Sequence, residues 1–509
     1  MKKAYLSIII ISSLILISGL TSELYLGDES YHWRFAKDWF TQGKRPIFDS
    51  LYESSLPPGF PYGSEPLWPF GLAFLWKIFN KISFPLAQIY HTFYFLLLLL
   101  FTYLVAKELY NEEVSFYSFL ILATIPMILA FSILFYLEVP VTSFIMFTFL
   151  MLLKKRYLLA GIGLGLIYLT KRNGLFLTPF FILFILYYEK TTFKRRILNI
   201  SIFILTSLLL IVPDIYWREK NFKIEYNLRE IPLDSEERRV STATVSTLLG
   251  IINRLKFPPQ FSFKRIRLFS PPDQATILNI IQVLRYFGLV AILLIILNLI
   301  NRKQREDLIL WLAILCYFIF FLYFFTPAGD LRYLMPVVPF ISILIAKTLF
   351  SIKKRYLRYT IFTLCFIQFI STLIYVNMKR HIPKDLKEGF NYLKYNTAND
   401  SLILYPGHII LEISERKVLW SRKGCLILNE LFWSEEKDKI INSIFGLGID
   451  YIMIDKDRIY DDSISHHYGG YPKSFVERLP NFDFIDLVFK NNKIKIFKIN
   501  KEKLLSYGN

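Results

Sequence analysis

Long apolar runs, separated by short polar segments, make up most of the chain as far as residue 376. The first runs from Ala4 to about Thr21. Ten more lie at about 86–106, 113–133, 139–153, 157–170, 174–188, 197–213, 277–299, 308–325, 333–350 and 359–376. A helix needs roughly 20 apolar residues to cross the hydrocarbon core of a bilayer. The pattern therefore predicts a polytopic α-helical membrane protein with about 11 transmembrane helices.

Basic residues cluster in alternate connections between these runs. Lys2 and Lys3 precede the first run, and the other clusters lie at 154–156, 194–196, 302–305 and 353–355. Loops that face the cytoplasm carry an excess of lysine and arginine. The alternation therefore predicts a multi-pass protein of the cell membrane with a cytoplasmic N-terminus, a retained first span and an extracytoplasmic C-terminal part.

Two long polar stretches interrupt the predicted transmembrane domain, residues 1–377. Residues 23–85 form the first outer loop, which is rich in tryptophan, tyrosine and proline. Segments 29–42 and 67–80 within this loop predict short amphipathic helices on the membrane surface, where aromatic residues are enriched. Residues 214–276 form a second outer loop that is too long for a plain connector, so we expect it to cover part of the protein.

The remaining residues, 378–509, predict a small soluble α/β domain on the outer face. Segments 384–395 and 435–447 have the pattern of helices, and segments 401–405, 451–455, 484–489 and 493–499 that of strands. Asn491 and Asn492 predict a turn that makes the last two strands a hairpin.

Composition narrows the class of partner. The net charge is +19, but the basic residues lie beside the apolar runs, which indicates membrane lipids rather than nucleic acid. Cys316, Cys365 and Cys425 have neither the spacing of a zinc site nor that of a disulfide framework. His466 and His467 are interpreted as surface residues of the C-terminal domain.

Acidic residues recur at the predicted outer surface. Asp28 and Glu29 follow the first span, and His32 lies four positions after Asp28, on the same face of a helix. Glu65 opens the second interfacial helix, and Glu138 lies in a very short loop between the third and fourth spans. Each acid also has a plain alternative, because Asp28 fits a helix cap, Glu65 fits a helix start and Glu138 fits a loop.

Basic residues at the same surface oppose the charge bias. Lys171, Arg172 and Arg332, which Tyr333 follows, lie outside by the span count. They either reach lipid head groups or bind an anionic ligand such as a phosphate. In transfer from a phosphate-linked donor, a carboxylate takes the proton of an acceptor hydroxyl, and cations stabilise the departing phosphate. Because nucleotide sugars are cytoplasmic, an outward-facing enzyme would use a donor carried by a lipid.

These motifs resemble the GT-C glycosyltransferase superfamily, and in particular the branch of protein O-mannosyltransferases and lipid A aminoarabinose transferases. The markers are Gly27-Asp28-Glu29-Ser30-Tyr31-His32, Glu65-Pro66-Leu67, Leu137-Glu138-Val139-Pro140, Lys171-Arg172 and Arg332-Tyr333-x-x-Pro336-x-x-Pro339. The resemblance covers most of the membrane part and, more loosely, the C-terminal part. It implies an outward-facing, inverting enzyme that transfers a sugar from polyprenyl phosphate to a protein, lipid or glycan acceptor.

The resemblance also implies roles for the candidate residues. Asp28 matches the general base of the first loop, and Glu138 matches an acid that orients the acceptor or a metal. The candidates for binding the donor phosphate are Lys171, Arg172, Arg332 and Tyr333. Neighbours of the substrate or metal are Glu29, His32 and Glu65. Metal dependence varies across the superfamily, so a divalent cation is left open.

One motif departs from the family pattern. Members often carry Lys-Pro-Pro-Leu where this chain has Glu65-Pro66-Leu67, so a lysine expected near the donor phosphate is missing. Either Lys171 or Arg172 compensates, or the donor is held differently.

Two other functions, a transporter and a non-catalytic scaffold, fit the sequence pattern less well than an enzyme. A transporter or flippase of lipid-linked sugars would carry ionisable residues in the middle of several spans, whereas most charges here lie at span ends. A non-catalytic scaffold that presents the C-terminal domain has no use for acids and bases gathered at the first loop. The pattern therefore favours a glycosyltransferase.

Overall fold

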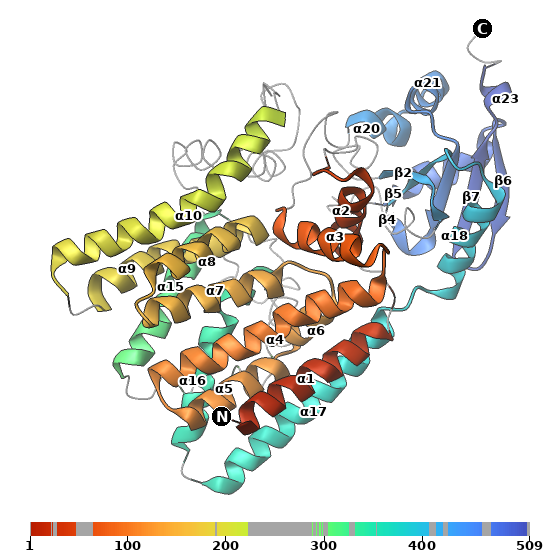
Figure 1. The fold of residues 1–509 in the computed structure, drawn as a ribbon. Coiled ribbons are helices and arrows are strands. Elements are labelled where there is room, and N and C mark those ends of the chain that lie inside the picture. Colours follow the sequence, from red (N-terminus) through yellow and green to blue (C-terminus); the bar gives the residue numbers. More distant parts are fainter. Residues whose placement is uncertain are drawn as a thin grey trace, which may run out of the picture.

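A computed structural model of the chain describes residues 2–21, 23, 28–46, 65–188, 191–221, 288, 292, 295, 296, 298, 304–324, 331–352, 354–406, 414–420, 426–460 and 470–505. The expected loop beyond residue 221, most of the span at 277–299, Cys425 and the pair His466-His467 lie outside these residues. Figure 1 shows a bundle of long helices with a sheet-containing domain beyond one end, away from the N-terminus.

The bundle follows the predicted spans. Its elements are α1 (Lys2–Leu20), α4 (Phe84–Leu109), α5 (Glu112–Thr124), α6 (Pro126–Ile133), α7 (Glu138–Leu153), α8 (Tyr157–Thr170), η1 (Arg172–Leu177), α9 (Thr178–Tyr188), α10 (Phe193–Asn221), α15 (Arg305–Phe324), η4 (Leu331–Val337), α16 (Val338–Ser351) and α17 (Arg355–Lys379). Within the described residues, five helices are long and apolar enough to cross a membrane, or six if a bent pair counts as one. The polytopic helical fold is confirmed, whereas the total of about 11 spans stays a prediction.

Two of the predicted span boundaries differ in the structure. The span at 113–133 is broken into α5 and α6, which meet at an angle of 67°. Pro126 causes the break, because proline lacks a backbone N–H and holds the preceding residue, Ile125, in an extended conformation. Helix α10 continues through Pro213 to Asn221, so the first residues of the loop expected at 214–276 are helical. This extension brings Asp214 and Arg218 into regular structure.

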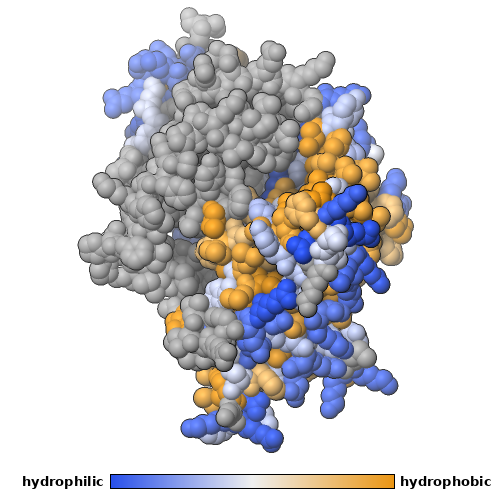
Figure 2. All heavy atoms as spheres, turned by 90° about the vertical axis from the view of Figure 1, so that its left-hand side faces the viewer, coloured by the Kyte–Doolittle hydropathy of each residue, from blue (hydrophilic) through white to orange (hydrophobic). Residues whose placement is uncertain are grey.

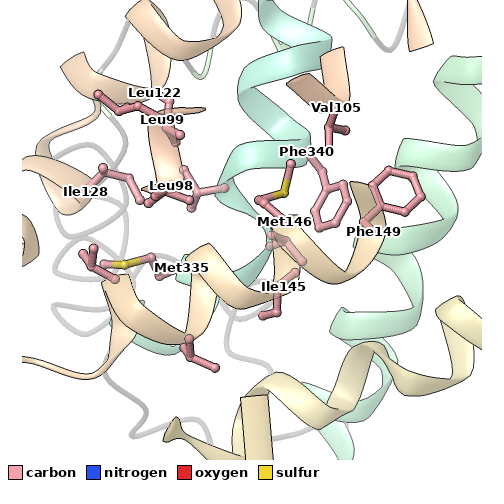
Figure 3. Close-up of a cluster of buried hydrophobic side chains, with 14 of the residues drawn as sticks. Leu98, Leu99, Val105, Leu122, Ile128, Ile145, Met146, Phe149, Met335 and Phe340 are labelled. Atoms are coloured by element: carbon pink, nitrogen blue, oxygen red, sulfur yellow. The ribbon is translucent and has the colours of Figure 1, made fainter. Parts of the chain in front are cut away.

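Apolar side chains hold the bundle together. Figure 3 shows Leu98 and Leu99 of α4 near Leu122 of α5 and Ile128 of α6, with Met146 and Phe149 of α7 beside Phe340 of α16. Leucine, isoleucine and phenylalanine side chains of α1, α10 and α17 are exposed on the outside of the bundle. Figure 2 shows apolar patches on one face of the molecule. An exposed apolar surface of this kind suits contact with lipid.

Glycines allow α8 and α10 to pack closely. Gly161 and Gly165 are spaced as in the small-residue motif of membrane helix pairs. A Cβ atom at Gly161 would meet the backbone carbonyl of Phe203, and one at Gly165 would lie 2.8 Å from the Leu210 side chain. The close approach aligns the C-terminal end of α8, which leads to Lys171 and Arg172, with the part of α10 that carries Asp214.

The first outer loop contains both predicted helices, α2 (Asp28–Gln42) and α3 (Leu67–Phe79). Their aromatic side chains differ from the expectation, because Trp68 and Trp76 are fully buried instead of lying at the membrane surface. The Trp33 ring lies 4.8 Å from that of Trp76 and is stacked on Phe135 at 6.2 Å. These aromatic contacts fasten α2 and α3 to the end of the bundle at which Phe135 lies.

The C-terminal part is a mixed α/β domain. Its five-stranded sheet has the order β2-β1-β3-β7-β6, with the first three strands parallel and β7 antiparallel to both of its neighbours. The strands are β1 (Leu402–Tyr405), β2 (Lys417–Trp420), β3 (Tyr451–Asp455), β6 (Ile485–Lys490) and β7 (Ile494–Ile499), and a small second sheet pairs β4 (Ile459–Tyr460) with β5 (Tyr471–Pro472). The helices are α18 (Lys384–Asn396), α20 (Leu426–Trp433), α21 (Lys437–Leu447), α22 (Lys473–Arg478) and α23 (Lys501–Leu505), with short 3-10 turns η5 (Lys456–Arg458) and η6 (Leu479–Asn481).

The hairpin predicted at Asn491 is present. The Asn491 side-chain oxygen accepts hydrogen bonds from the backbone N–H groups of Lys493 and Ile494, at 3.1 and 2.8 Å. The four-residue strand β2 and the two-residue strands β4 and β5 were not predicted. The domain boundary expected at 377/378 stays a prediction; α17 ends at Lys379 and α18 begins at Lys384.

Candidate functional site

Glu138 lies at the centre of one group of predicted site residues, the Glu138 cluster (Glu138, Lys171, Arg332 and Tyr333). It is the first residue of α7 and is fully buried. The Lys171 ammonium donates to Oε1 of Glu138 at 2.5 Å, and Nε of Arg332 lies 3.5 Å from the same oxygen. The structure thus joins an acid and two bases that the sequence placed on one surface.

Tyr333 supports both bases of this cluster. Its ring centroid lies 4.9 Å from Nζ of Lys171 and 5.2 Å from the guanidinium carbon of Arg332. The Tyr317 hydroxyl donates to the Tyr333 carbonyl and so holds η4 in place. Cations placed over an aromatic ring gain electrostatic stabilisation. The two bases are therefore held firmly beside Glu138.

A second group, the arginine cluster (Glu65, Arg172, Arg45, Asp214 and Arg218), lies among α2, α3, α8 and α10. Nε of Arg172 lies 3.4 Å from Oε1 of Glu65. Asp214 binds Arg218 at 2.8 Å through one carboxylate oxygen and Arg45 at 2.6 Å through the other. Arg218 and Asp214 lie within electrostatic reach of Arg172. Among the described residues of the cluster, three guanidinium groups thus face two carboxylates, which leaves one positive charge in excess.

Several guanidinium N–H groups in the arginine cluster make no hydrogen bond to the described residues. Among the described residues, Nε and Nη2 of Arg172, Nη2 of Arg218 and Nε of Arg45 are buried and make no hydrogen bond. Burial lowers the pKa of Arg45 to about 10 although Asp214 opposes this, so the side chain is still charged at neutral pH. A buried donor without a partner costs about 1–3 kcal/mol, and more when it is charged. The cluster is therefore suited to an anion that supplies several oxygen acceptors.

The sequence alone did not point to Arg45, Asp214 or Arg218. Arg45 lies in the first loop, and the other two lie past the span end expected at residue 213. The spacing of Asp214 and Arg218, four residues apart, is a helix ion-pair signal that could have been used. It was not recognised because the segment was assigned to a loop.

Glu29 lies in a third place, at the first turn of α2, and is fully buried. Its Oε1 accepts a hydrogen bond from the Phe135 backbone N–H at 3.2 Å and is paired with Arg380. Asp28 is the first residue of α2, and its side chain lies outside the described residues. Glu29 therefore connects the helix turn that begins with Asp28 to the loop that leads to Glu138.

Two histidines lie near these groups. His32 is buried, and its ring meets the rings of Trp68 and Tyr31 at 6.2 and 5.5 Å. His91 of α4, which was not singled out from the sequence, packs on Phe135 at 5.8 Å, and its Nε2 lies 2.9 Å from the Phe131 carbonyl oxygen. Within the described residues, no three His, Cys, Asp or Glu side chains form a group that could hold a metal ion.

Two family profiles match parts of the chain. Residues 61–217 match the family described as dolichyl-phosphate-mannose-protein mannosyltransferase. Residues 276–410 match the Alg9-like mannosyltransferase family. The first match includes the Glu65, Glu138, Arg172 and Asp214 positions, and the second includes Arg332 and Arg380. No curated protein sequence matches the chain.

Solved structures share the fold over nearly the whole chain. ArnT from Cupriavidus metallidurans in the apo state has a TM-score of 0.63 at 11% identity, with 98% of each chain covered. The same protein bound to undecaprenyl phosphate has a TM-score of 0.62 at 10% identity, with 97% of each chain covered. Archaeal oligosaccharyltransferase AglB from Archaeoglobus fulgidus, in complex with an inhibitory peptide and a dolichol-phosphate, has a TM-score of 0.59 at 15% identity, covering 89% of this chain and 69% of that one.

Proposed function

We propose that the chain, which shares the fold of ArnT and matches two mannosyltransferase families over parts of its length, works as a GT-C membrane glycosyltransferase. In this proposal it transfers a sugar from a polyprenyl-phosphate donor to an acceptor on the outer face of the membrane. Both matched families are described as mannosyltransferases. Structural neighbours have been solved with undecaprenyl phosphate or a dolichol-phosphate bound. The observation that carries the proposal is the arginine cluster, in which several buried guanidinium N–H groups make no hydrogen bond among the described residues.

The donor phosphate binds the arginine cluster in this proposal. Arg172 lies beside Glu65, the position next to which the family often carries a lysine. Lys171, by contrast, is engaged by Glu138. Of the two residues considered for the missing lysine, Arg172 therefore takes the role, with Arg218 and Arg45 as further donors. Charge-assisted hydrogen bonds from guanidinium groups stabilise the negative charge that grows on the departing phosphate.

In the same proposal, the acceptor is activated at the end of the bundle that carries the arginine cluster. Asp28 takes the proton from an acceptor hydroxyl, whose oxygen attacks the anomeric carbon of the sugar. The bond from that carbon to the phosphate oxygen breaks, and its electron pair leaves with polyprenyl phosphate. A single displacement of this kind inverts the anomeric centre. Glu138, with Lys171, Arg332 and Tyr333, orients the acceptor and the sugar beside the phosphate.

The same proposal includes the sidedness of the protein. Glu138 begins α7, Lys171 follows α8, and Arg380 follows α17, so these site residues lie at helix ends. The C-terminal domain continues from the same end of α17. The distribution of lysine and arginine puts that end outside and the N-terminus in the cytoplasm. The acceptor is a protein, lipid or glycan that is reached from the outer face.

Deletion of the gene tests the proposal. Cells that lack the protein should lose a glycan from a protein, lipid or polysaccharide. The wild-type chain should restore it, and Asp28→Asn should not, because removing a general base lowers a rate by roughly 10²–10⁴-fold. Unchanged glycans in the deletion strain, or full restoration by Asp28→Asn, would contradict the corresponding part of the proposal.

A second experiment separates the enzyme from a transporter of lipid-linked sugars. The purified protein in detergent micelles, which have no two compartments, should release polyprenyl phosphate from polyprenyl-phosphate mannose when membranes of the deletion strain supply the acceptor. A transporter would leave the donor intact in detergent and move it only across a vesicle bilayer.

A further inference from the structure

A fully buried ion pair joins two segments that lie 351 residues apart. Glu29 is the second residue of α2, and Arg380 directly follows α17; both side chains have no exposed surface. The guanidinium of Arg380 also lies 5.6 and 5.5 Å from the ring centroids of Phe84 and Phe135. Because an apolar pair of similar size is often as stable as a buried ion pair, stability alone does not account for this one.

Three segments meet at the Glu29 carboxylate. One is the first turn of α2, which begins with Asp28. The second is the loop before α7, whose Phe135 N–H donates to Glu29 and which ends at Glu138. The third is the connection from α17 to the C-terminal domain, which contributes Arg380. The carboxylate therefore links the segments that carry the two acids to which the proposed mechanism assigns roles.

The second Glu29 oxygen, Oε2, is buried and has no hydrogen-bond partner among the described residues. Arg380 and the Phe135 N–H thus supply the stabilisation of this carboxylate in the described part of the chain. Loss of Arg380 would leave a buried anion with one neutral donor. The first turn of α2 would have to move to bring the carboxylate to water.

We propose that Glu29 and Arg380 form a positioning pair, which fixes the Asp28 turn relative to the Glu138 loop. The catalytic geometry then depends on the segment that leads from α17 into the C-terminal domain. The proposal rests on the proposed function of Asp28. Neither residue touches the substrate in it. A misplacement of about 1 Å caused by a distant change can cost roughly 100-fold in rate, so a pair that sets this distance controls turnover.

An exposed ion pair beside it provides a matched control. Glu23 accepts from Lys387 at 2.9 Å and from the Ile382 N–H at 2.9 Å, and so joins the same two segments. Its partner Lys387 is half exposed, and an exposed pair contributes little. Lys387→Ala removes the ion pair, keeps the hydrogen bond from the Ile382 N–H to Glu23, and leaves Glu29 and Arg380 in place.

The test compares Arg380→Gln, Arg380→Lys, Glu29→Gln and Lys387→Ala in detergent, with polyprenyl-phosphate mannose as donor and membranes of the deletion strain as acceptor. Arg380→Gln should lower kcat roughly 100-fold and leave the donor KM within about threefold, because the arginine cluster is separate. Arg380→Lys, which keeps the charge, should recover part of the loss. Lys387→Ala should match the wild-type chain. In cells, restoration of the lost glycan should follow the same order.

Binding of a polyprenyl phosphate to each variant separates positioning from general damage to the fold. It should be retained in Arg380→Gln, and the Arg380→Gln/Glu29→Gln double variant should lose less than the product of the single losses, since the unpaired charge is gone. Wild-type kcat in Arg380→Gln would overturn the positioning pair, and so would joint loss of binding and turnover in both Arg380 variants. Full activity of Asp28→Asn would instead overturn the proposed function, which keeps the two failures distinct.

Discussion

Lys171 and Arg172 are neighbours in the chain, but their side chains join different clusters. Lys171 has an extended backbone, with φ −165° and ψ 120°, between the end of α8 and the start of η1. Side chains of consecutive residues point to opposite sides of an extended segment. Lys171 therefore binds Glu138, and Arg172 lies beside Glu65. Two residues that looked interchangeable in the sequence have separate environments.

This separation predicts different effects of the two residues on the donor. Arg172→Gln should weaken binding of a polyprenyl phosphate by about 10- to 100-fold, because a hydrogen bond to a charged group contributes roughly 1.5–3 kcal/mol. Lys171→Gln should reduce turnover and change that binding little, since Lys171 is already paired with Glu138. Titration of purified variants with polyprenyl phosphate measures both. Equal weakening by the two changes would place the phosphate between the clusters.

At the scale of elements, the arginine cluster depends on how α8 and α10 pack. Arg172 follows α8, whereas Asp214 and Arg218 are carried by α10. Glycines of α8 let the two helices approach, and the continuation of α10 past Pro213 carries the acid and the arginine to the level of Arg172. The site is therefore assembled by a helix contact in the apolar part of the bundle.

Gly161→Leu should separate the two helices, because even a Cβ atom at this position would meet the Phe203 carbonyl, which is backbone and cannot turn away. We expect weaker polyprenyl phosphate binding together with a lower melting temperature, since overpacking costs about 1–3 kcal/mol. Thermal unfolding and ligand titration of the same sample measure both effects.

Gly446→Ala in α21 is the control for this change, because nothing lies within 4 Å of a Cβ atom there. It should leave ligand binding as in the wild-type chain and raise helix stability by up to about 1 kcal/mol. Wild-type binding and melting in Gly161→Leu would show that the close helix contact does not set the geometry of the cluster.

At the scale of the whole molecule, the N-terminus and the C-terminal domain lie at opposite ends of the bundle (Figure 1). The C-terminal domain stands beside α2 and α3, on the end where the acids and bases gather. Arg380, in the segment that leads into this domain, pairs with Glu29 of the first loop. This arrangement allows the domain to influence the site while its own sheet packs separately around two apolar clusters.

Sidedness can be measured with single cysteines in a Cys425→Ser background. The native Cys316 and Cys365 are buried. A membrane-impermeant thiol reagent should label Lys490→Cys in intact cells, because this exposed residue belongs to the C-terminal domain. It should label Lys155→Cys, an exposed residue in a basic connection between α7 and α8, only after the membrane is opened. The reverse pattern would invert the proposed orientation and move the site to the cytoplasmic face.

The helical membrane fold, the mixed C-terminal domain and the resemblance to GT-C glycosyltransferases were all predictable from local sequence patterns. Apolar runs and turn residues are local features, so they can be recognised without knowing how the chain packs. They located α1, α4, α7 and α8, both helices of the first loop and the last hairpin. The two-residue strands were missed because so few residues carry little pattern. The bend at Pro126 was also missed, although proline is a local signal for a helix break.

The pairing of each base with an acid, by contrast, is visible only in the folded chain. Arg45 reaches Asp214 across 169 residues, and Glu29 reaches Arg380 across 351. Such pairs depend on the path of several helices. The sequence does not distinguish an arginine that pairs with an acid from one that binds lipid head groups. The acids and bases were therefore recognisable as a group, whereas their division into an arginine cluster, a Glu138 cluster and a buried pair arises from packing.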